Sequence, residues 1–145
     1  MGESCVRLPE QRLWDRMRAA FGEYGVLAHR IENVVAVGMP DVVTACNGAV
    51  SFLELKAIAA APARNTTPLL GAKHGLSAEQ RNWHHDWNAA NCVTFVVIGV
   101  GREVLVIDGR EADLVNRMTY RDALAASRAM TWHGLVSLLG CGRDG

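Results

Sequence analysis

The sequence has no excess of charge of either sign. Its 145 residues include 15 lysines and arginines and 15 aspartates and glutamates, so the formal net charge at pH 7 is zero. A chain without net positive charge has no general attraction for polyanions, and a nucleic-acid partner would need a local basic surface. Composition alone therefore identifies no partner, and a functional assignment must rest on particular residues.

Cysteines are few and scattered, and long apolar runs are missing. Cys5, Cys46, Cys92 and Cys141 form no C-x-x-C pair and follow no secretory leader, which predicts reduced thiols rather than disulfides in a cytoplasmic protein. No apolar stretch approaches the roughly eighteen residues that a membrane-spanning helix needs. We therefore expect a soluble protein with no membrane partner.

Half of the residues are apolar, which suffices for one packed domain over residues 1–145 and leaves no room for a second. Periodicity, turn residues and helix caps predict an alternation of helices and strands, which is the pattern of an α/β domain. The expected helices are 9–21, 76–90 and one or two after 108; the expected strands are 26–32, 41–46, 49–56, 92–100 and 103–108, with a long loop over 57–75.

The strongest local signal is a hairpin around Asn47-Gly48, a dipeptide typical of two-residue turns. In such a hairpin the numbers of opposed residues have a constant sum, so Asp41 is expected opposite Glu54, with Cβ atoms roughly 4.5 to 5.5 Å apart. Lys56 lies two residues further along and shares that face. The pattern thus predicts two carboxyl groups and one ammonium group together at the end of a strand pair.

Two adjacent carboxylates repel each other unless one is protonated or a cation lies between them. Mg²⁺ prefers oxygen ligands, commonly one or two carboxylates plus substrate phosphate oxygens, and a neighbouring lysine can orient water or stabilise developing charge. The alternative is that Asp41 and Glu54 are surface residues neutralised by Lys56. Finding all three on one face, with Pro40 before the aspartate, favours the metal site.

Three short motifs of this sequence resemble those of a known family and occur in the same order. Gly38-Met-Pro-Asp41 and Phe52-Leu-Glu-Leu-Lys56 resemble the PD-(D/E)xK nuclease superfamily, and Leu76-Ser-Ala-Glu-Gln80 extends the resemblance to its VRR-NUC group. The similarity spans roughly residues 10–97. The C-terminal strand and helices, 103–140, lie outside it.

The resemblance implies a restriction-endonuclease-like core, in which a central mixed β-sheet (α+β) is flanked by helices. It implies that Asp41 and Glu54 are metal ligands, with the Leu55 carbonyl as a further ligand, and that Lys56 is the catalytic lysine. The family also tends to place a glutamate on the first helix, and Glu10 has the spacing of that helix's apolar face. The other interpretation of Glu10 is a first-turn acid favoured by the helix dipole.

Gln80 also has two interpretations. Ser77-x-x-Gln80 is a capping box, which many helix starts contain, yet the matching family position belongs to an active-site helix. Trp83 and Trp87 continue the face of Gln80, and we interpret them as core residues rather than as residues that stack on bases.

A local basic surface is predicted between residues 57 and 85, where the only acid is Glu79. Phosphate contact by Arg64, Lys73 and Arg81 is one interpretation, and a solvated face is the other. The strand before the G-x-P-D turn often carries a basic residue in the resembling family, which singles out Arg30. Three histidines, without the spacing of a zinc site, would add charge below neutral pH: His74, His84 and His85.

The combined prediction is a DNA endonuclease that uses Mg²⁺ or Mn²⁺, with a preference for branched, flap or junction DNA as one option. A non-cleaving nucleic-acid-binding protein on the same fold is the alternative, and an unrelated small domain with a chance match is a third. Helices after residue 108 would provide the interface of a homodimer or pack into the core. A small stand-alone nuclease of this type resembles phage proteins, which would place it in the cytoplasm of the host.

Overall fold

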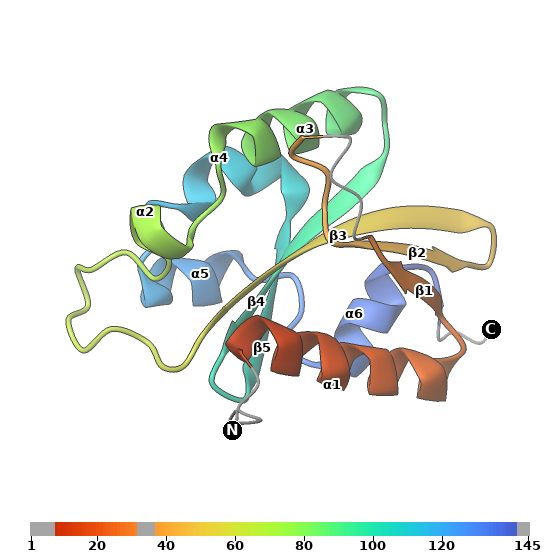
Figure 1. Cartoon of the computed structure of the whole chain (residues 1–145), viewed down its shortest axis with the longest axis horizontal. Coiled ribbons are helices and arrows are strands. Elements are labelled where there is room, and N and C mark those ends of the chain that lie inside the picture. Colours follow the sequence, from red (N-terminus) through yellow and green to blue (C-terminus); the bar gives the residue numbers. More distant parts are fainter. Residues whose placement is uncertain (1–7, 32–36, 142–145) are drawn as a thin grey trace, which may run out of the picture.

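The computed structural model describes residues 8–31 and 37–141. Five strands form one mixed sheet in the order β1-β2-β3-β4-β5, where β3 and β4 are parallel and the other neighbours are antiparallel. The strands are Leu27–Arg30, Val42–Cys46, Ala49–Ile58, Val93–Val100 and Glu103–Asp108. This confirms the predicted mixed sheet flanked by helices (Figure 1).

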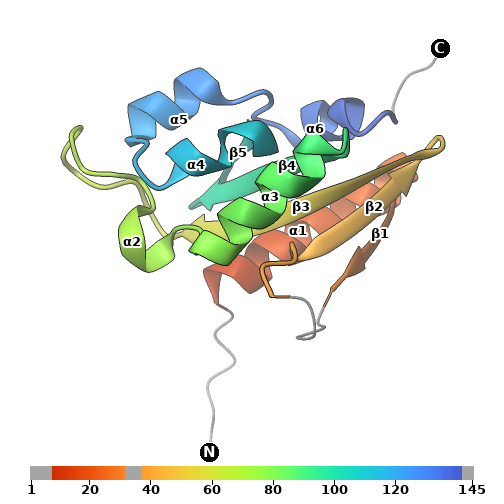
Figure 2. The same ribbon diagram turned by 90° about the horizontal axis from the view of Figure 1, so that it is seen from above.

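Helices cover both faces of the sheet. α1 (Pro9–Tyr24) and α6 (Trp132–Leu138) bury apolar side chains against the face that carries Leu53 and Leu55. The other helical segments are α2 (Gly71–His74), α3 (Ala78–Ala89), the 3₁₀ helix η1 (Gly109–Glu111), α4 (Ala112–Val115) and α5 (Tyr120–Ala126). Figure 2 shows α3, α4 and α5 on the opposite side of the sheet from α1. Each face of the sheet is therefore covered by its own apolar core.

The β2–β3 hairpin has the predicted register. Cys46 pairs with Ala49 and Val43 pairs with Phe52. Asn47 and Gly48 have φ values of 51° and 84°, which is the backbone that a two-residue turn of this kind requires. The turn therefore fixes which side chains of β3 lie on which face.

The first helix is longer than the predicted 9–21. It continues through Gly22 to Tyr24 and ends at Gly25, whose φ of 77° closes the helix. A glycine inside a helix costs only about 1 kcal/mol relative to alanine, so Gly22 does not outweigh the burial of Phe21 and Met17 on the same helix. The following strand is shorter than predicted, and the rest of the predicted 26–32 segment beyond residue 31 lies outside the described residues.

The predicted loop over 57–75 contains more structure than expected. β3 continues to Ile58, because the parallel partner β4 pairs with it as far as Val100. Leu69 and Leu70 are buried in the second core, and α2 follows them. The region after residue 108 is likewise divided into several short helical segments rather than one or two helices.

The prediction of reduced cysteines is wrong for one pair. Cys46, at the end of β2, and Cys141, which follows α6, form a disulfide with a Cα–Cα distance of 5.7 Å. Asn47 Nδ2 also donates a hydrogen bond of 2.8 Å to the Gly140 carbonyl oxygen. The two cysteines are 95 residues apart in sequence, and they meet because α6 returns the chain to the tip of the hairpin. Among the described residues, no helix combines the length and apolarity needed to cross a membrane.

Candidate active site

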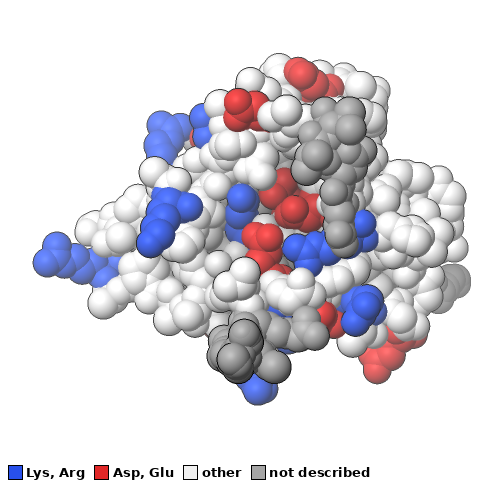
Figure 3. Space-filling model, in the orientation of Figure 1, with Lys and Arg blue, Asp and Glu red and all other residues white. Residues whose placement is uncertain are grey.

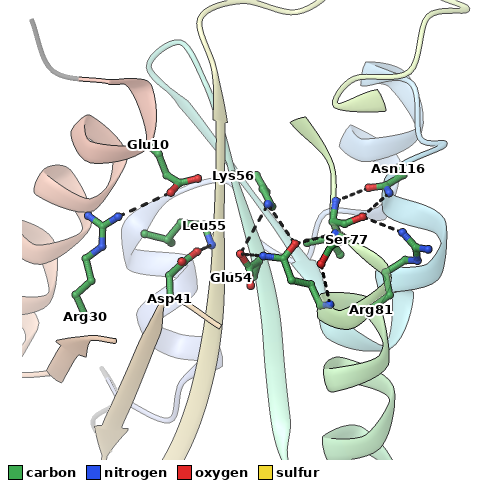
Figure 4. A network of polar contacts seen from close by, with 11 residues as sticks. Glu10, Arg30, Asp41, Glu54, Leu55, Lys56, Ser77, Arg81 and Asn116 are labelled. Atoms are coloured by element: carbon green, nitrogen blue, oxygen red, sulfur yellow. Dashed lines mark hydrogen bonds and ion pairs between the residues drawn. The ribbon is translucent and has the colours of Figure 1, made fainter. Parts of the chain in front are cut away.

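The hairpin brings the predicted carboxyl groups together at one end of β3. Asp41 immediately precedes β2, and its Oδ2 atom accepts a hydrogen bond of 2.8 Å from the Leu55 backbone nitrogen. Its carboxyl group therefore reaches the neighbouring strand beside Glu54, as Figure 4 shows. This is the arrangement that the hairpin register predicted.

Glu54 is almost completely removed from water, with 1% of its surface exposed. Burial and the neighbouring Asp41 carboxyl, in that order, raise the pKa of Glu54 to about 10. Its Oε1 atom is buried and accepts no hydrogen bond from any described residue. A buried carboxylate needs a proton or a cation for stability, so this oxygen is a candidate ligand for a cation.

Lys56 follows Glu54 on the same face of β3. Its Nζ atom lies 3.9 Å from Glu54 Oε2 and donates a hydrogen bond of 3.3 Å to Gln80 Oε1. The side chain is 15% exposed, so it is largely shielded from water. The lysine is thus fixed beside the carboxyl pair.

Gln80 forms the predicted capping box and also contacts Glu54 and Lys56, while its contact with substrate stays a prediction. Its Oε1 accepts a hydrogen bond of 2.8 Å from the Ser77 backbone nitrogen, and Ser77 Oγ accepts one of 3.1 Å from the Gln80 backbone nitrogen, which is a capping box. Its Nε2 also donates a hydrogen bond of 3.1 Å to Glu54 Oε2. The cap therefore holds the amide in the orientation in which it contacts both Glu54 and Lys56.

Glu10 and Arg30 border the carboxyl pair from the other side (Figure 4). Arg30 lies 3.8 Å from Glu10 and donates a hydrogen bond of 3.0 Å to Gln11. Burial first, and then the charge of Asp41, raise the pKa of Glu10. Among the described residues no group of three or more acidic, histidine or cysteine side chains is arranged to hold a metal ion, so the third-ligand role of Glu10 stays a prediction.

The donor set nevertheless fits a hard divalent cation. Such ions are usually bound by one or two carboxylates and complete their coordination with water and substrate phosphate oxygens. Asp41 and Glu54 supply two adjacent carboxyl groups, and Glu54 Oε1 is a buried oxygen without a partner among the described residues. The Leu55 carbonyl remains a ligand implied by the resemblance alone.

The face that holds the site has a mixed charge. Figure 3 shows acidic side chains gathered near the middle of this face, with basic side chains on either side of them. A cation between the acidic side chains would reduce their repulsion of an approaching phosphodiester. The surroundings therefore agree with the donor set.

The basic residues of the 57–85 segment differ in their surroundings. Arg64 and Lys73 are exposed. Arg81 Nη1 donates a hydrogen bond of 2.8 Å to the Leu76 carbonyl oxygen, which ties it to the segment before α3. Phosphate contact by these three residues stays a prediction, and Arg81 also has a supporting position.

Of the three histidines expected to add charge below neutral pH, His84 has a lowered pKa and stays neutral over most of that range. It is a fully buried residue of α3, and burial lowers its pKa to about 4. Its Nδ1 atom lies 2.8 Å from Thr94 Oγ1 on β4. The neutral ring therefore helps to hold α3, and with it Gln80, against the sheet.

Two supporting residues had not been singled out in the sequence. Asn116 Oδ1 accepts a hydrogen bond of 2.7 Å from the Leu76 nitrogen, and its Nδ2 donates one of 2.8 Å to the Leu76 oxygen. Gln11 binds Arg30. No motif marks either residue, and Asn116 is 40 residues away from its partner. Gly38 is explained by packing, since a Cβ atom there would clash with the Glu79 carbonyl oxygen.

The prediction that the tryptophans of α3 belong to the core is wrong for Trp87, of which 42% is exposed. Trp83 is half-buried and packs against Phe52 of β3, with ring centroids 5.0 Å apart. The two indole rings stack at 4.7 Å with an interplanar angle of 12°. The helical face of Gln80 therefore continues as an aromatic surface beside the site.

Comparison with solved structures identifies the fold. The chain is similar to Hjc of Archaeoglobus fulgidus, a Holliday junction resolvase from an archaeal hyperthermophile, with a TM-score of 0.50 and 15% sequence identity over 69% of this chain and 77% of that chain. The chain therefore has the predicted restriction-endonuclease-like fold. A solved VRR_NUC domain gives a TM-score of 0.47 and 18% identity over 64% of this chain and 86% of that chain. No protein-family model and no curated protein matches the chain.

Proposed function

We propose that the protein is a divalent-metal-dependent endonuclease that hydrolyses phosphodiester bonds of branched DNA. The observation that carries this proposal is the buried Glu54 carboxyl group, with one oxygen unpartnered among the described residues, beside Asp41 and Lys56. A protein with this fold but without an active site at this position would have no reason to bury an acidic side chain. The fold's similarity to a junction resolvase supports a nucleic acid as the substrate.

Asp41 and Glu54 would hold Mg²⁺ or Mn²⁺, and Glu10 and the Leu55 carbonyl are candidates for further contacts. A divalent ion bound there would lower the pKa of water and neutralise charge on the phosphate. Glu54 is kept in position by its hydrogen bond from Gln80, and Asp41 by its hydrogen bond from Leu55. The two acids are therefore oriented before substrate binds.

Lys56 would act on the reacting phosphate or the attacking water. Its ammonium group has three N–H donors, and its described contacts are with Gln80 and Glu54. A further donor is thus available to an oxygen of the phosphate or to a water molecule. Because Gln80 and Glu54 restrain the lysine, a hydrogen bond to developing negative charge needs little reorganisation.

A branched DNA is the substrate we propose, because the similar protein Hjc is a Holliday junction resolvase. A homodimer would place two such sites on one four-way junction, one for each of two strands. Arg30, Arg64, Lys73 and Arg81 are the candidates for contacts with the phosphate backbone. These contacts would give the local attraction for DNA that the neutral chain lacks as a whole.

The test is cleavage of a DNA panel by the purified protein. The panel contains a four-way junction, a flap, a nicked duplex and a plain duplex of one length, each incubated with Mg²⁺, with Mn²⁺ or with chelator. We expect cutting of branched DNA only with metal, and its loss in Asp41→Asn and Lys56→Met with melting temperatures retained. Cutting in chelator would overturn the proposal, and so would cutting by both variants at the rate of the parent. DNA binding without cutting by the parent would favour the non-cleaving alternative.

A further inference from the structure

Three aromatic rings form a surface next to the candidate site. Phe52 is two residues before Glu54 on the same face of β3, while Trp83 and Trp87 follow Gln80 by one and two turns of α3. We call Phe52, Trp83 and Trp87 the aromatic patch. The Phe52 ring lies 5.0 Å from Trp83 and 5.4 Å from Trp87, so the strand and the helix form it together.

The patch is an open stack rather than a closed core. Trp83 and Trp87 are nearly parallel, 4.7 Å apart. Although Trp83 covers one face of Trp87 and Phe52 lies beside it, 42% of Trp87 remains exposed. A flat apolar surface is therefore available to one more planar ring, which would stack in the offset arrangement that aromatic rings prefer.

The patch is close enough to the carboxyl pair to contact the same substrate strand. Two residues along a β-strand span about 7 Å, which separates Phe52 from Glu54. Trp87, the most exposed ring of the patch, follows Gln80 by seven residues, which is about 10 Å along the helix axis, and a few nucleotides of one strand extend over that distance. Gln80, one turn before Trp83, donates directly to Glu54.

We propose that the aromatic patch binds an unpaired nucleobase next to the phosphodiester that is cut, with Trp87 as the stacking surface. This inference rests on the proposed function and specifies its substrate class as DNA with an unpaired nucleotide at the branch. Bases inside an intact duplex are already stacked, so only an unpaired or displaced base offers a free face. A protein partner fits less well, because specific interfaces bury about 800 Å² on each side and the exposed surface here is mainly one indole ring.

Binding to two DNA probes tests this inference. One probe is a fork with two unpaired thymidine arms and a 2-aminopurine at the branch, and the other is a fully paired duplex of equal length, both measured with Ca²⁺ in place of Mg²⁺. We expect Trp87→Leu, which keeps apolar volume but removes the flat ring, to weaken fork binding about tenfold. Binding of the paired duplex should not change, and Trp87→Phe should retain most of the fork affinity.

The fluorescence of 2-aminopurine should be quenched by the parent and by Trp87→Phe, and not by Trp87→Leu. Val93→Ala is the matched control, because Val93 is 49% exposed at the start of β4 and is not part of the patch. Equal fork affinity of Trp87→Leu and the parent would overturn the inference, as would an equal loss for both probes. If the parent cuts DNA with Mg²⁺ in that case, the proposed function still stands. If the parent neither binds nor cuts any DNA, both fail.

Discussion

Three neighbouring residues of β3 are buried, two apolar ones on one face and an acidic one on the other. Leu53 and Leu55 are 0% exposed on the face covered by α1, and Glu54 between them is 1% exposed on the other face. Burial of a leucine is worth about 1.5–3 kcal/mol of stability. Burial of a carboxylate costs several kcal/mol unless it is paired, and the raised pKa of Glu54 reports that cost. One face of the strand therefore stabilises the fold, and the other holds the carboxyl group to which we assign the reaction.

The largest expected effect is on cutting, by Glu54→Gln. The substitution keeps the shape and the hydrogen bond from Gln80, but removes the charge that would hold a metal. We expect the single-turnover rate on a four-way junction with Mg²⁺ to fall by at least about a thousandfold. Glu79→Gln, which changes an exposed acid on the same helix as Gln80, is the control and should cut like the parent. Similar cutting rates for Glu54→Gln and Glu79→Gln would contradict the role of Glu54 in cutting.

Leu53→Ala should have the converse effect, because it changes the stabilising face. Removing a fully buried leucine side chain leaves a cavity and is expected to lower the free energy of unfolding by about 3 kcal/mol. Cutting well below the melting temperature should remain within a few-fold of the parent. Urea unfolding measures the first effect, and Val50→Ala, at a 53% exposed position of the same strand, should lose less than about 0.5 kcal/mol. A Leu53→Ala protein that is as stable as the parent but does not cut would contradict this separation of stability from activity.

The disulfide tests whether the far end of the hairpin is independent of the site. Cys141→Ser removes a crosslink between residues 95 positions apart and is expected to cost about 2–4 kcal/mol of stability. Because the crosslink is at the turn end of β2 and β3, cutting by the folded protein should not change. Chemical unfolding with and without reductant checks the parent in parallel. If reductant leaves the stability of the parent unchanged, the Cys46–Cys141 disulfide contributes nothing to the free energy of unfolding.

A smaller effect is expected from pH in the absence of divalent ions. Glu54 has a pKa of about 10 when folded and 4.5 as its ordinary value, so between these values the folded state binds the additional proton. Stability due to this group must then fall as pH rises from 5 to 9, because the unfolded state gains by ionising. Melting temperatures in chelator should decrease over this range in the parent and less so in Glu54→Gln. If the melting temperatures of the parent and of Glu54→Gln depend equally on pH, folding does not raise the pKa of Glu54.

Much of the site could be predicted because its geometry is local. Asn47-Gly48 sets the register of the hairpin, and the register places Asp41 beside Glu54 and Lys56. The capping pattern Ser77-x-x-Gln80 placed Gln80 at a helix start, and only the contact with Glu54 needed the tertiary structure. Short-range rules about turns, strands and caps therefore gave the centre of the site.

The remaining features depend on contacts between distant segments. The Cys46–Cys141 disulfide and the Asn116 contacts join residues whose proximity is set by helix packing rather than by any pattern. The exposure of Trp87 follows from the position of α3 on the sheet, since spacing alone gives a helical face but not what covers it. Gly22 remained inside α1 because tertiary burial of the helix outweighed its low helix propensity.

The central claim is that the carboxyl pair of Asp41 and buried Glu54 binds a divalent ion. Calorimetric titration of Mn²⁺ into the parent and into Glu54→Gln, in two buffers of different ionisation enthalpy, tests it most directly. Because Glu54 is protonated near neutral pH without metal, Mn²⁺ binding to the parent should release about one proton, and Glu54→Gln should bind weakly and release none. Equal binding and equal proton release by the two proteins would contradict the account.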